Sequence, residues 1–399
     1  MKVVNKTYKY RIYPNAEQAL ALAQHFGHCR YIYNFALDKK ISFYEQTGKS
    51  LSKNEISAML PELKKNEQTC WLKDVNSQSL QASLENLDKS FKNFFRNKAF
   101  GFPKFKNKNA KQSFAVPQGF DLDFENNLLK IPKMKQGLKA IFHRTISGIP
   151  RSLTISKSIT NKYFASILVL QGQSPVPIPV DENQAIGIDM GIKTYAVLSN
   201  GLTIENPKHF KKFENKITNL QRLLSKRVKG SARRAKIKQR LALAHEHLFN
   251  TRSDFIHKLS SNLVSSYDTI CLEDLNIKGL MEKKNSPSRE MADASWGVFV
   301  NQLVYKSERS GKNILFAGRF DPTSKRCSCG FINHDLQLSD REWQCPQCGQ
   351  LNDRDGNAAQ NIKMFAFNKI NGQELPSMPV AELIEAGSSN ALRRGSSRY

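Results

Sequence analysis

The stretch AIGIDMGIKTYAVLSNG, residues 185–201, places an aspartate inside a run that otherwise has the composition of a buried strand. Two apolar segments flank Gly191, where a chain can turn sharply, so the stretch predicts a hairpin of two short strands. Asp189 interrupts the first of them. A carboxylate in a buried strand is unfavourable unless it is paired or binds a metal. The hairpin therefore predicts a core sheet that carries a functional acid.

Two further acidic segments fit the same interpretation. In YDTICLEDLNIKGL (267–280) Glu273 and Asp274 close an apolar strand, and in NDRDGNAAQNI (352–362) two aspartates precede the first turns of a helix. Each feature alone is weak evidence, because such residues often only cap turns and helices. Together they supply the carboxylates with which two Mg²⁺ ions, roughly 3.5 to 4 Å apart, hydrolyse phosphodiesters. Their order on a hairpin, a strand and a helix matches the RNase H-like fold.

Four of the seven cysteines crowd into one segment, namely Cys327, Cys329, Cys345 and Cys348. An odd total with one cluster favours a metal over disulfides, and we expect one structural Zn²⁺. The second pair has the usual spacing of half a zinc site, whereas a single residue separates the first pair. His334 could replace one of the thiolates.

The totals constrain partners and location. At 399 residues and 40% hydrophobic content the chain is long enough for two or three folded domains. No apolar run approaches the length of a membrane span, and the N-terminus lacks an apolar signal core, so we expect a cytoplasmic protein without a membrane partner. The net charge of +26, from 61 Lys and Arg against 35 Asp and Glu, indicates a polyanionic partner, with nucleic acid favoured over a membrane surface.

The first half predicts a strand, helices and then a small β-barrel or sandwich. TYKYRIYP (7–14) alternates like a strand that ends at Pro14, and helical spacing continues to about residue 98. Residues 112 to about 176 then alternate and turn. One helix carries a core stripe formed by Leu80, Leu84, Leu87, Phe91 and Phe94 or Phe95. Its polar region offers candidate readers of base edges, Lys73, Gln78 and Gln81, although such residues are often only solvated.

Two basic segments predict nucleic-acid surfaces. Residues 89–111 hold eight basic residues, six phenylalanines and no acid, which suits phosphate binding and base stacking. There we expect Phe91, Phe94 and Phe95 to be core, and Phe102, Lys104, Phe105 and Lys106 to contact nucleic acid. Residues 208–240 hold thirteen basic residues and the single acid Glu214, with Gly230 between two expected helices. This predicts a helical hairpin that presents Arg222, Lys226, Lys229, Arg233, Lys236 and Arg240 to a phosphate backbone.

The segments GIDMGIK, ICLEDLNIKGL, DPTSKRCSCG, CPQCG and NDRDGNAAQNI, in this order, closely resemble the TnpB (OrfB) proteins of bacterial insertion sequences, the small relatives of type V CRISPR effectors. YKYRIYPN and GFPKFKNKNAKQSFAVP resemble the family's N-terminal half, so the resemblance covers nearly the whole chain. It implies an α/β multidomain protein. A RuvC (RNase H-like) nuclease domain with an inserted zinc element would follow β-barrel wedge and α-helical recognition domains.

Applied to this chain, the resemblance and the linker composition divide the sequence into seven segments. These are a first wedge strand (1–13), a helical recognition domain (14–98), a wedge β-barrel (99–176), a first nuclease part with the basic hairpin (177–326), a zinc element (327–350), the last nuclease helix (351–370) and a flexible tail (371–399).

The resemblance also implies roles for residues and partners. The family's catalytic acids and Mg²⁺ ligands fall on Asp189, Glu273 and Asp355, because in its DRDxNAA pattern the acid two places before Asn binds metal. Asp353 should then point elsewhere, toward a basic neighbour. A guide RNA from the transposon end would direct cleavage of double-stranded DNA beside a short adjacent motif, with base pairing reading the longer sequence.

Other functions fit less well. A guided repressor or accessory transposition protein without cleavage is expected to lack a metal acid, and this chain keeps all three. A tyrosine transposase needs a paired-histidine motif, for which only His245 and His247 are at hand, in a basic helix. A zinc-ribbon DNA-binding protein would leave Asp189 and Glu273 unexplained. The sequence alone leaves the guide, the adjacent motif, the cleavage pattern and the choice between monomer and dimer open.

Overall fold

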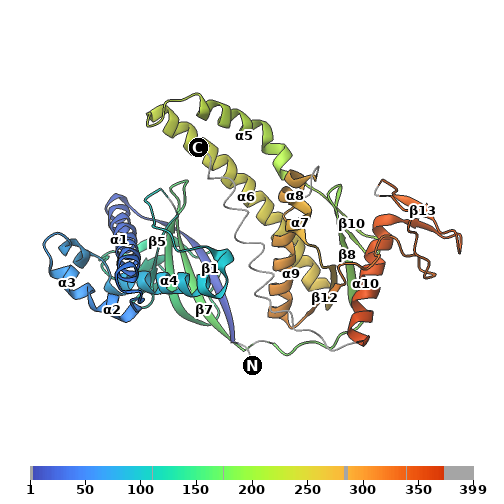
Figure 1. Cartoon of the computed structure of the whole chain (residues 1–399), viewed down its shortest axis with the longest axis horizontal. Coiled ribbons are helices and arrows are strands. Elements are labelled where there is room, and N and C mark those ends of the chain that lie inside the picture. Colours follow the sequence, from blue (N-terminus) through green and yellow to red (C-terminus); the bar gives the residue numbers. More distant parts are fainter. Residues whose placement is uncertain (1–2, 110, 174, 283–285, 338, 373–399) are drawn as a thin grey trace. The chain divides into compact units, whose positions relative to one another are not determined.

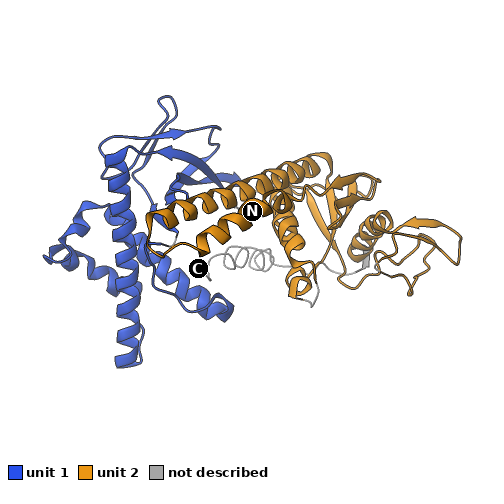
Figure 2. Cartoon of the chain, turned by 90° about the horizontal axis from the view of Figure 1, so that it is seen from above, with its two compact units in different colours: residues 1–173 blue, residues 174–399 orange. Residues whose placement is uncertain are grey.

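A computed structural model describes residues 3–109, 111–173, 175–282, 286–337 and 339–372 (Figure 1). The chain forms two compact units, residues 1–173 and 174–399, and each is described by itself (Figure 2). The flexible tail expected at 371–399 lies outside the described residues, apart from the two positions that end the last helix. No helix in the described ranges is long and apolar enough to span a membrane.

The first unit is built on a seven-stranded antiparallel sheet of order β2-β6-β7-β1-β5-β4-β3. Its central strand β1 (Val3–Tyr13) pairs with β7 and β5, so the opening of the chain joins strands more than 120 residues away. The others are β2 (Gln112–Val116), β3 (Asp121–Asp123), β4 (Leu128–Lys130), β5 (Leu138–Ile141), β6 (Ile149–Lys157) and β7 (Tyr163–Gln173). In the described residues β2 and β3 are edges, so the sheet is a half-barrel, whereas we expected a small β-barrel or sandwich. Closure needs a continuous ladder, and β3 and β4 have only three residues each.

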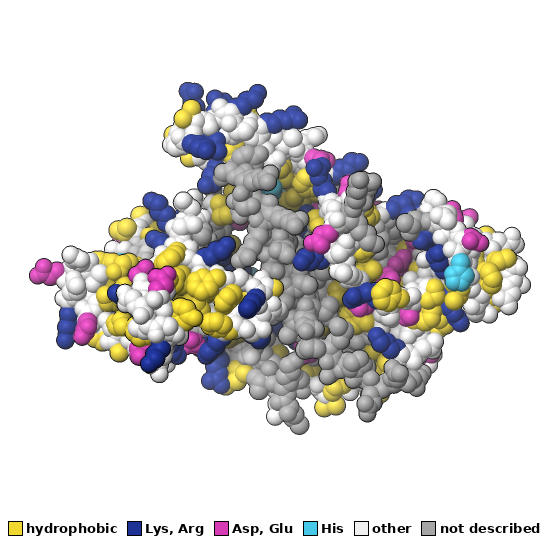
Figure 3. Space-filling view, viewed as in Figure 1, with side chains coloured by type: hydrophobic (Ala, Val, Ile, Leu, Met, Phe, Trp, Pro, Cys, Tyr) yellow, Lys and Arg dark blue, Asp and Glu magenta, His cyan; other side chains and the backbone are white. Residues whose placement is uncertain are grey.

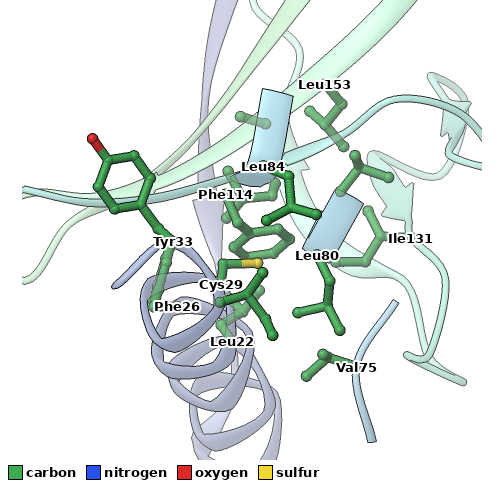
Figure 4. Close-up of a cluster of buried hydrophobic side chains, with 14 of the residues drawn as sticks. Leu22, Phe26, Cys29, Tyr33, Val75, Leu80, Leu84, Phe114, Ile131 and Leu153 are labelled. Atoms are coloured by element: carbon green, nitrogen blue, oxygen red, sulfur yellow. The ribbon is translucent and has the colours of Figure 1, made fainter. Parts of the chain in front are cut away.

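Helices cover one side of this sheet. They are α1 (Ala16–Thr47), α2 (Lys53–Ala58), α3 (Leu60–Lys65) and α4 (Ser77–Arg96), with short 3₁₀ turns at Cys70–Asp74 and Lys98–Phe100. Asn15 and Gln18 form a capping box that starts α1, and Gly48 in a left-handed conformation ends it. Side chains of α1, α4 and β2 then pack in one core (Figure 4).

The predicted stripe of α4 is correct for its leucines and for Phe91, which packs against the same core, and wrong for Phe95. Leu80, Leu84 and Leu87 are buried. Phe91 and Phe94 are half-buried, and Phe95 is 74% exposed. The final turn of α4, which carries Phe95, extends beyond the core, so helical periodicity continues there without a core to pack against.

The second unit contains a five-stranded mixed sheet of order β10-β9-β8-β11-β12. Strands β8 (Ala185–Met190), β11 (Thr269–Glu273) and β12 (Asn313–Ala317) are parallel. Strands β9 (Thr194–Leu198) and β10 (Thr203–Glu205) are antiparallel to their neighbours, and β8 with β9 forms the hairpin predicted around Gly191. Figure 1 shows α9 (Trp296–Ser310) and α10 (Arg354–Gly372) on opposite sides of this sheet.

The basic segment forms the predicted helical hairpin. Helix α5 (His209–Ser225) and the longer α6 (Ala232–Ser266) meet through Ile217, Ala244 and Leu248. Gly230 turns the chain between them at φ 88°, and the Ser231 side chain caps α6. The unit is completed by α7 (Ile277–Glu282), α8 (Ser288–Ala294) and a small ladder of β13 (Glu342–Gln344) with β14 (Leu351–Asp353).

Candidate functional site

Two of the predicted acids lie on the same face of the second unit's sheet. Side chains alternate along a strand, so neighbouring residues face opposite cores. Ile188 of β8 packs in the core with α6 and α9, whereas Cys271 of β11 packs with α10. Asp189 and Glu273 therefore face the α10 side. The parallel register pairs Leu272 with Ile188, which places Glu273 level with Asp189 at the carboxyl ends of adjacent strands.

A close contact at Gly187 places α10 on this face. A Cβ atom at Gly187 would lie 2.1 Å from the carbonyl oxygen of Ala359 and 3.0 Å from Cβ of Lys363, so only glycine permits this approach. Asp355 precedes Ala359 by one helical turn, and Asp189 is the next residue after Gly187 on the same face of β8. The contact thus brings the carboxylates of Asp189 and Asp355 within electrostatic range of each other.

The electrostatics of Asp189 reflect this crowding. Burial, and then the charges of Asp355 and Glu273, raise the pKa of Asp189 to about 7, while the nearby charge of Arg354 acts in the opposite direction. Burial and neighbouring acidic charges also raise the pKa of Glu273. A carboxylate whose pKa is raised by burial and like charges marks a candidate functional site. The fold therefore brings together three acids that are separated by up to 166 residues in the chain.

The two aspartates of the DRD segment have different surroundings. Asp353 Oδ1 accepts a hydrogen bond from the backbone N–H of Gly356 at 2.7 Å, which caps the start of α10. Both carboxylate oxygens of Asp355 accept from Nη1 of Arg341, at 3.1 and 3.2 Å. The expected pairing of Asp353 with a basic neighbour is therefore wrong. Asp353 ends β14, and its side chain bonds to the first turn of the helix.

Three charged residues that lie near these acids were not identified from the sequence. Arg341 holds Asp355, Arg354 lies near Asp189, and Asp321 contributes to the raised pKa of Glu273. Asp321 follows β12, a third parallel strand, and ligand-binding residues gather at the carboxyl ends of such strands, so its position carried a usable signal. Nothing in the local sequence links Arg341 to a residue fourteen positions later.

The four clustered cysteines converge. Their sulfur atoms all lie within 4.8 Å of one another, with Cys327 to Cys348 at 3.7 Å and Cys329 to Cys345 at 3.6 Å. Within the described ranges, these cysteines are the one group of three or more possible metal ligands whose ligand atoms lie this close together. His334 does not belong to the group. The single residue between Cys327 and Cys329 thus does not prevent the first pair from facing the second. Gly330 and Gly349, both left-handed, turn the chain after each pair.

The segment before the cysteines is joined directly to α10. The side-chain amide of Asn357 donates to the carbonyl of Arg326 at 2.8 Å. That of Asn361 donates to the carbonyls of Thr323 and Arg326 at 2.8 and 2.7 Å. Because Arg326 immediately precedes Cys327, these bonds fix the cysteine cluster against the helix that carries Asp355.

The predicted nucleic-acid residues lie at the surface, in both units. Phe102 and Phe105 are 47% and 55% exposed, Lys104 is exposed, and Nζ of Lys106 lies 3.8 Å above the ring of Tyr33. Lys73 and Gln81 are exposed and Gln78 is half-buried, near the start of α4. All six basic residues predicted on the helical hairpin are exposed, and Figure 3 shows Lys and Arg side chains gathered over it. These residues are Arg222, Lys226, Lys229, Arg233, Lys236 and Arg240.

Three family descriptions match parts of the chain. Residues 166–284 match "Probable transposase" of the OrfB IS605 type, and residues 296–362 match "Cas12f1-like, TNB domain". Residues 1–49 match "Helix-turn-helix domain", although here they form strand β1 and the single helix α1.

Relatives match over most of the length. The chain is 34% identical to a protein of Streptomyces pristinaespiralis and 31% identical to InsQ of Escherichia coli (strain K12), over 91% and 90% of this chain and 89% and 91% of the relatives. The names of both describe an RNA-guided DNA endonuclease. The fold is similar to that of Cas12f1 in a complex with guide RNA and target DNA, with a TM-score of 0.53 and 16% identity over 90% of this chain and 99% of that one. By its identity to these relatives along nearly its whole length, the chain belongs to the TnpB (OrfB) family.

Proposed function

We propose that this protein is an RNA-guided DNA endonuclease that cuts double-stranded DNA beside a short adjacent motif. The observation that carries the proposal is the convergence of Asp189, Glu273 and Asp355 on the α10 face of the second unit's sheet. The names of the relatives and the Cas12f1-like fold support it. In this proposal the five-stranded sheet with α10 is the RuvC (RNase H-like) nuclease domain, within residues 177–370.

The three carboxylates are the proposed ligands of two Mg²⁺ ions. They provide the oxygen donors that Mg²⁺ prefers, and their crowding leaves negative charge that a cation would balance. Two such ions would activate a water molecule and stabilise the leaving oxygen of a phosphodiester. Asp189 and Glu273 hold fixed positions on strands, and Asp355 is set by the contact of α10 with Gly187. Arg341 orients the Asp355 carboxylate from the other side.

The four cysteines are the proposed ligands of one structural Zn²⁺. In a tetrahedral site with Zn–S bonds of about 2.3 Å, sulfur atoms lie about 3.8 Å apart. The distances of 3.6 and 3.7 Å in this cluster fit that geometry. Bound there, the ion would hold the β13–β14 ladder, whose exit leads within one residue into α10.

The exposed basic surfaces are the proposed contacts for the guide RNA, encoded at the transposon end, and for target DNA. The half-barrel (residues 1–13 and 99–176) and the helices of residues 14–98 correspond in this proposal to the wedge and recognition domains. Lys73, Gln78 and Gln81 are candidates for reading the adjacent motif. The basic residues of the helical hairpin would bind phosphates, which requires no base sequence.

A matched pair of substitutions tests the proposal. Asp355→Asn keeps the shape of the side chain but removes its charge, and we expect cleavage of a guide-matched duplex with Mg²⁺ to fall to background. Asp353→Asn should cleave normally, because asparagine is an equally good helix cap. Both variants should still bind the guide and the duplex. Normal cleavage by Asp355→Asn would exclude the proposed three-carboxylate metal site. Loss of cleavage in Asp353→Asn alone would show that Asp353, and not Asp355, is the metal ligand.

A further inference from the structure

Four phenylalanines contact one another where α4 ends, two of them half-buried and two exposed at the surface. Phe91, Phe94, Phe95 and Phe102 make up this phenylalanine cluster. The Phe102 ring meets the rings of Phe91 and Phe94 edge-on at 5.5 Å, and Phe95 lies 6.2 Å from Phe91 and 5.3 Å from Phe94. Phe95 is 74% exposed and Phe102 47% exposed. Figure 3 shows hydrophobic side chains gathered at the surface around α4.

The surroundings of the phenylalanine cluster are basic. Residues 89–111 contain eight Lys and Arg and no acid, and the nearest acid before them, Asp88, is paired with Lys92 at 2.8 Å. The exposed Arg96 and Lys98 follow Phe95, and the guanidinium of Arg96 lies 5.9 Å from the ring of Phe100. A hydrophobic protein partner would supply no negative charge to this basic segment. A polyanion with flat apolar groups would satisfy both the charges and the rings.

We propose that the phenylalanine cluster stacks unpaired bases of the guide RNA. Paired bases hide their faces inside a duplex, so rings at a surface can stack only on bases that are unpaired or at a duplex end. Exposed aromatic side chains that touch one another promote aggregation unless a partner covers them. The guide would stay bound both before and after the protein meets its target. We therefore favour RNA over DNA as the partner of these rings. The inference rests on the proposed function only for the presence of a guide.

Fluorescence anisotropy with the full-length protein tests the proposal. The probe is a fluorescein-labelled 12-nucleotide oligoadenosine RNA, compared with the same strand in a duplex with oligouridine. The double variant Phe95→Ala/Phe102→Ala should lower affinity for the single strand by about 10- to 100-fold. Affinity for the duplex should stay within about twofold, since no charge is changed. Phe95→Trp/Phe102→Trp should retain wild-type affinity, because tryptophan also stacks.

The control is Phe124→Ala, which removes a phenylalanine that is 41% exposed but lies between Asp123 and Glu125. It should bind both probes as the wild type does. Unchanged single-strand affinity in the double alanine variant overturns the proposal. If that variant instead changes from oligomer to monomer in light scattering, the phenylalanine cluster is a protein contact.

A second measurement identifies the nucleic acid. Irradiation at 254 nm of the protein purified with RNA from its transposon end should join peptides that contain Phe95 or Phe102 to ribonucleotides. Cross-links that form on other peptides and not on those with Phe95 or Phe102 refute the assignment to the guide. Because neither experiment measures cleavage, either one can fail while the Asp355→Asn test of nuclease activity succeeds.

Discussion

The contact between Gly187 and α10 gives a substitution whose effect can be worked out from the structure. In Gly187→Ala the new Cβ would lie 2.1 Å from the carbonyl oxygen of Ala359, whereas ordinary contacts begin near 3.4 Å, so α10 must move by about 1 Å. The backbone of a helix cannot rotate away as a side chain can. Overpacking of this kind costs about 1–3 kcal/mol of unfolding free energy. A displacement of about 1 Å at a catalytic group costs about 100-fold in rate.

We therefore expect Gly187→Ala to cleave a guide-matched duplex about 100-fold more slowly while it binds the guide as tightly as the wild type does. Single-turnover cleavage and filter binding measure the two quantities. Gly297→Ala is the control in the same unit, because its new Cβ would make only ordinary contact, 3.8 Å from Cδ1 of Ile277. Wild-type cleavage and stability in Gly187→Ala would refute the assignment of α10 as the element that positions Asp355.

Three other outcomes are expected. Metal analysis should find one zinc per chain, and Cys348→Ser should lower both the melting temperature and the cleavage rate; absence of zinc with full activity would contradict the proposed metal site. Burial lowers the pKa of His25, whose Nε2 accepts the N–H of Asn76 at 3.4 Å, so the wild type should lose stability as the pH falls from 7 to 5; thermal melting should show a shallower loss in His25→Gln. Affinity for the guide should fall steeply between about 50 and 200 mM salt, because phosphate contacts release counterions; a flat salt profile in anisotropy would exclude binding through the basic surfaces.

Hydrophobic periodicity predicted correctly which residues are buried wherever a helix or strand packs against a neighbour along its whole length. The leucines of α4 and the apolar residues of β8 are buried, because periodicity of 3.6 or 2 residues directly encodes which side faces a core. Phe95 continues the same kind of stripe and is exposed, because the pattern of a helix does not reveal where its neighbour ends. The half-barrel was missed for a similar reason. Alternating sequence patterns identify the strands. Whether a sheet closes into a barrel depends instead on how its edge strands are placed.

The acids could be found in the sequence, and so could the position of Asp321 after a parallel strand, but the contacts that these residues make could not. A carboxylate within an apolar strand is visible without coordinates, because its burial has to be compensated. The bond from Arg341 to Asp355 depends on the turn of the cysteine hairpin, which brings the residue before β13 back to the second residue after β14. Asp321 is close to Glu273 only because β11 and β12 are adjacent and parallel. Both contacts are tertiary, and local propensity contains no information about them.

The position of Asp355 is fixed from two directions, and one of them involves the segment that carries the cysteine cluster. On one side, the strand at Gly187 sets how closely α10 approaches the sheet. On the other, the amides of Asn357 and Asn361 hold α10 to the backbone just before Cys327. A helix held only by the sheet could still slide along it or rotate, and one held only by the cysteine segment could move away from Asp189. The two contacts together remove both freedoms, so the cluster needs no direct part in the chemistry to be required for the geometry of the acids.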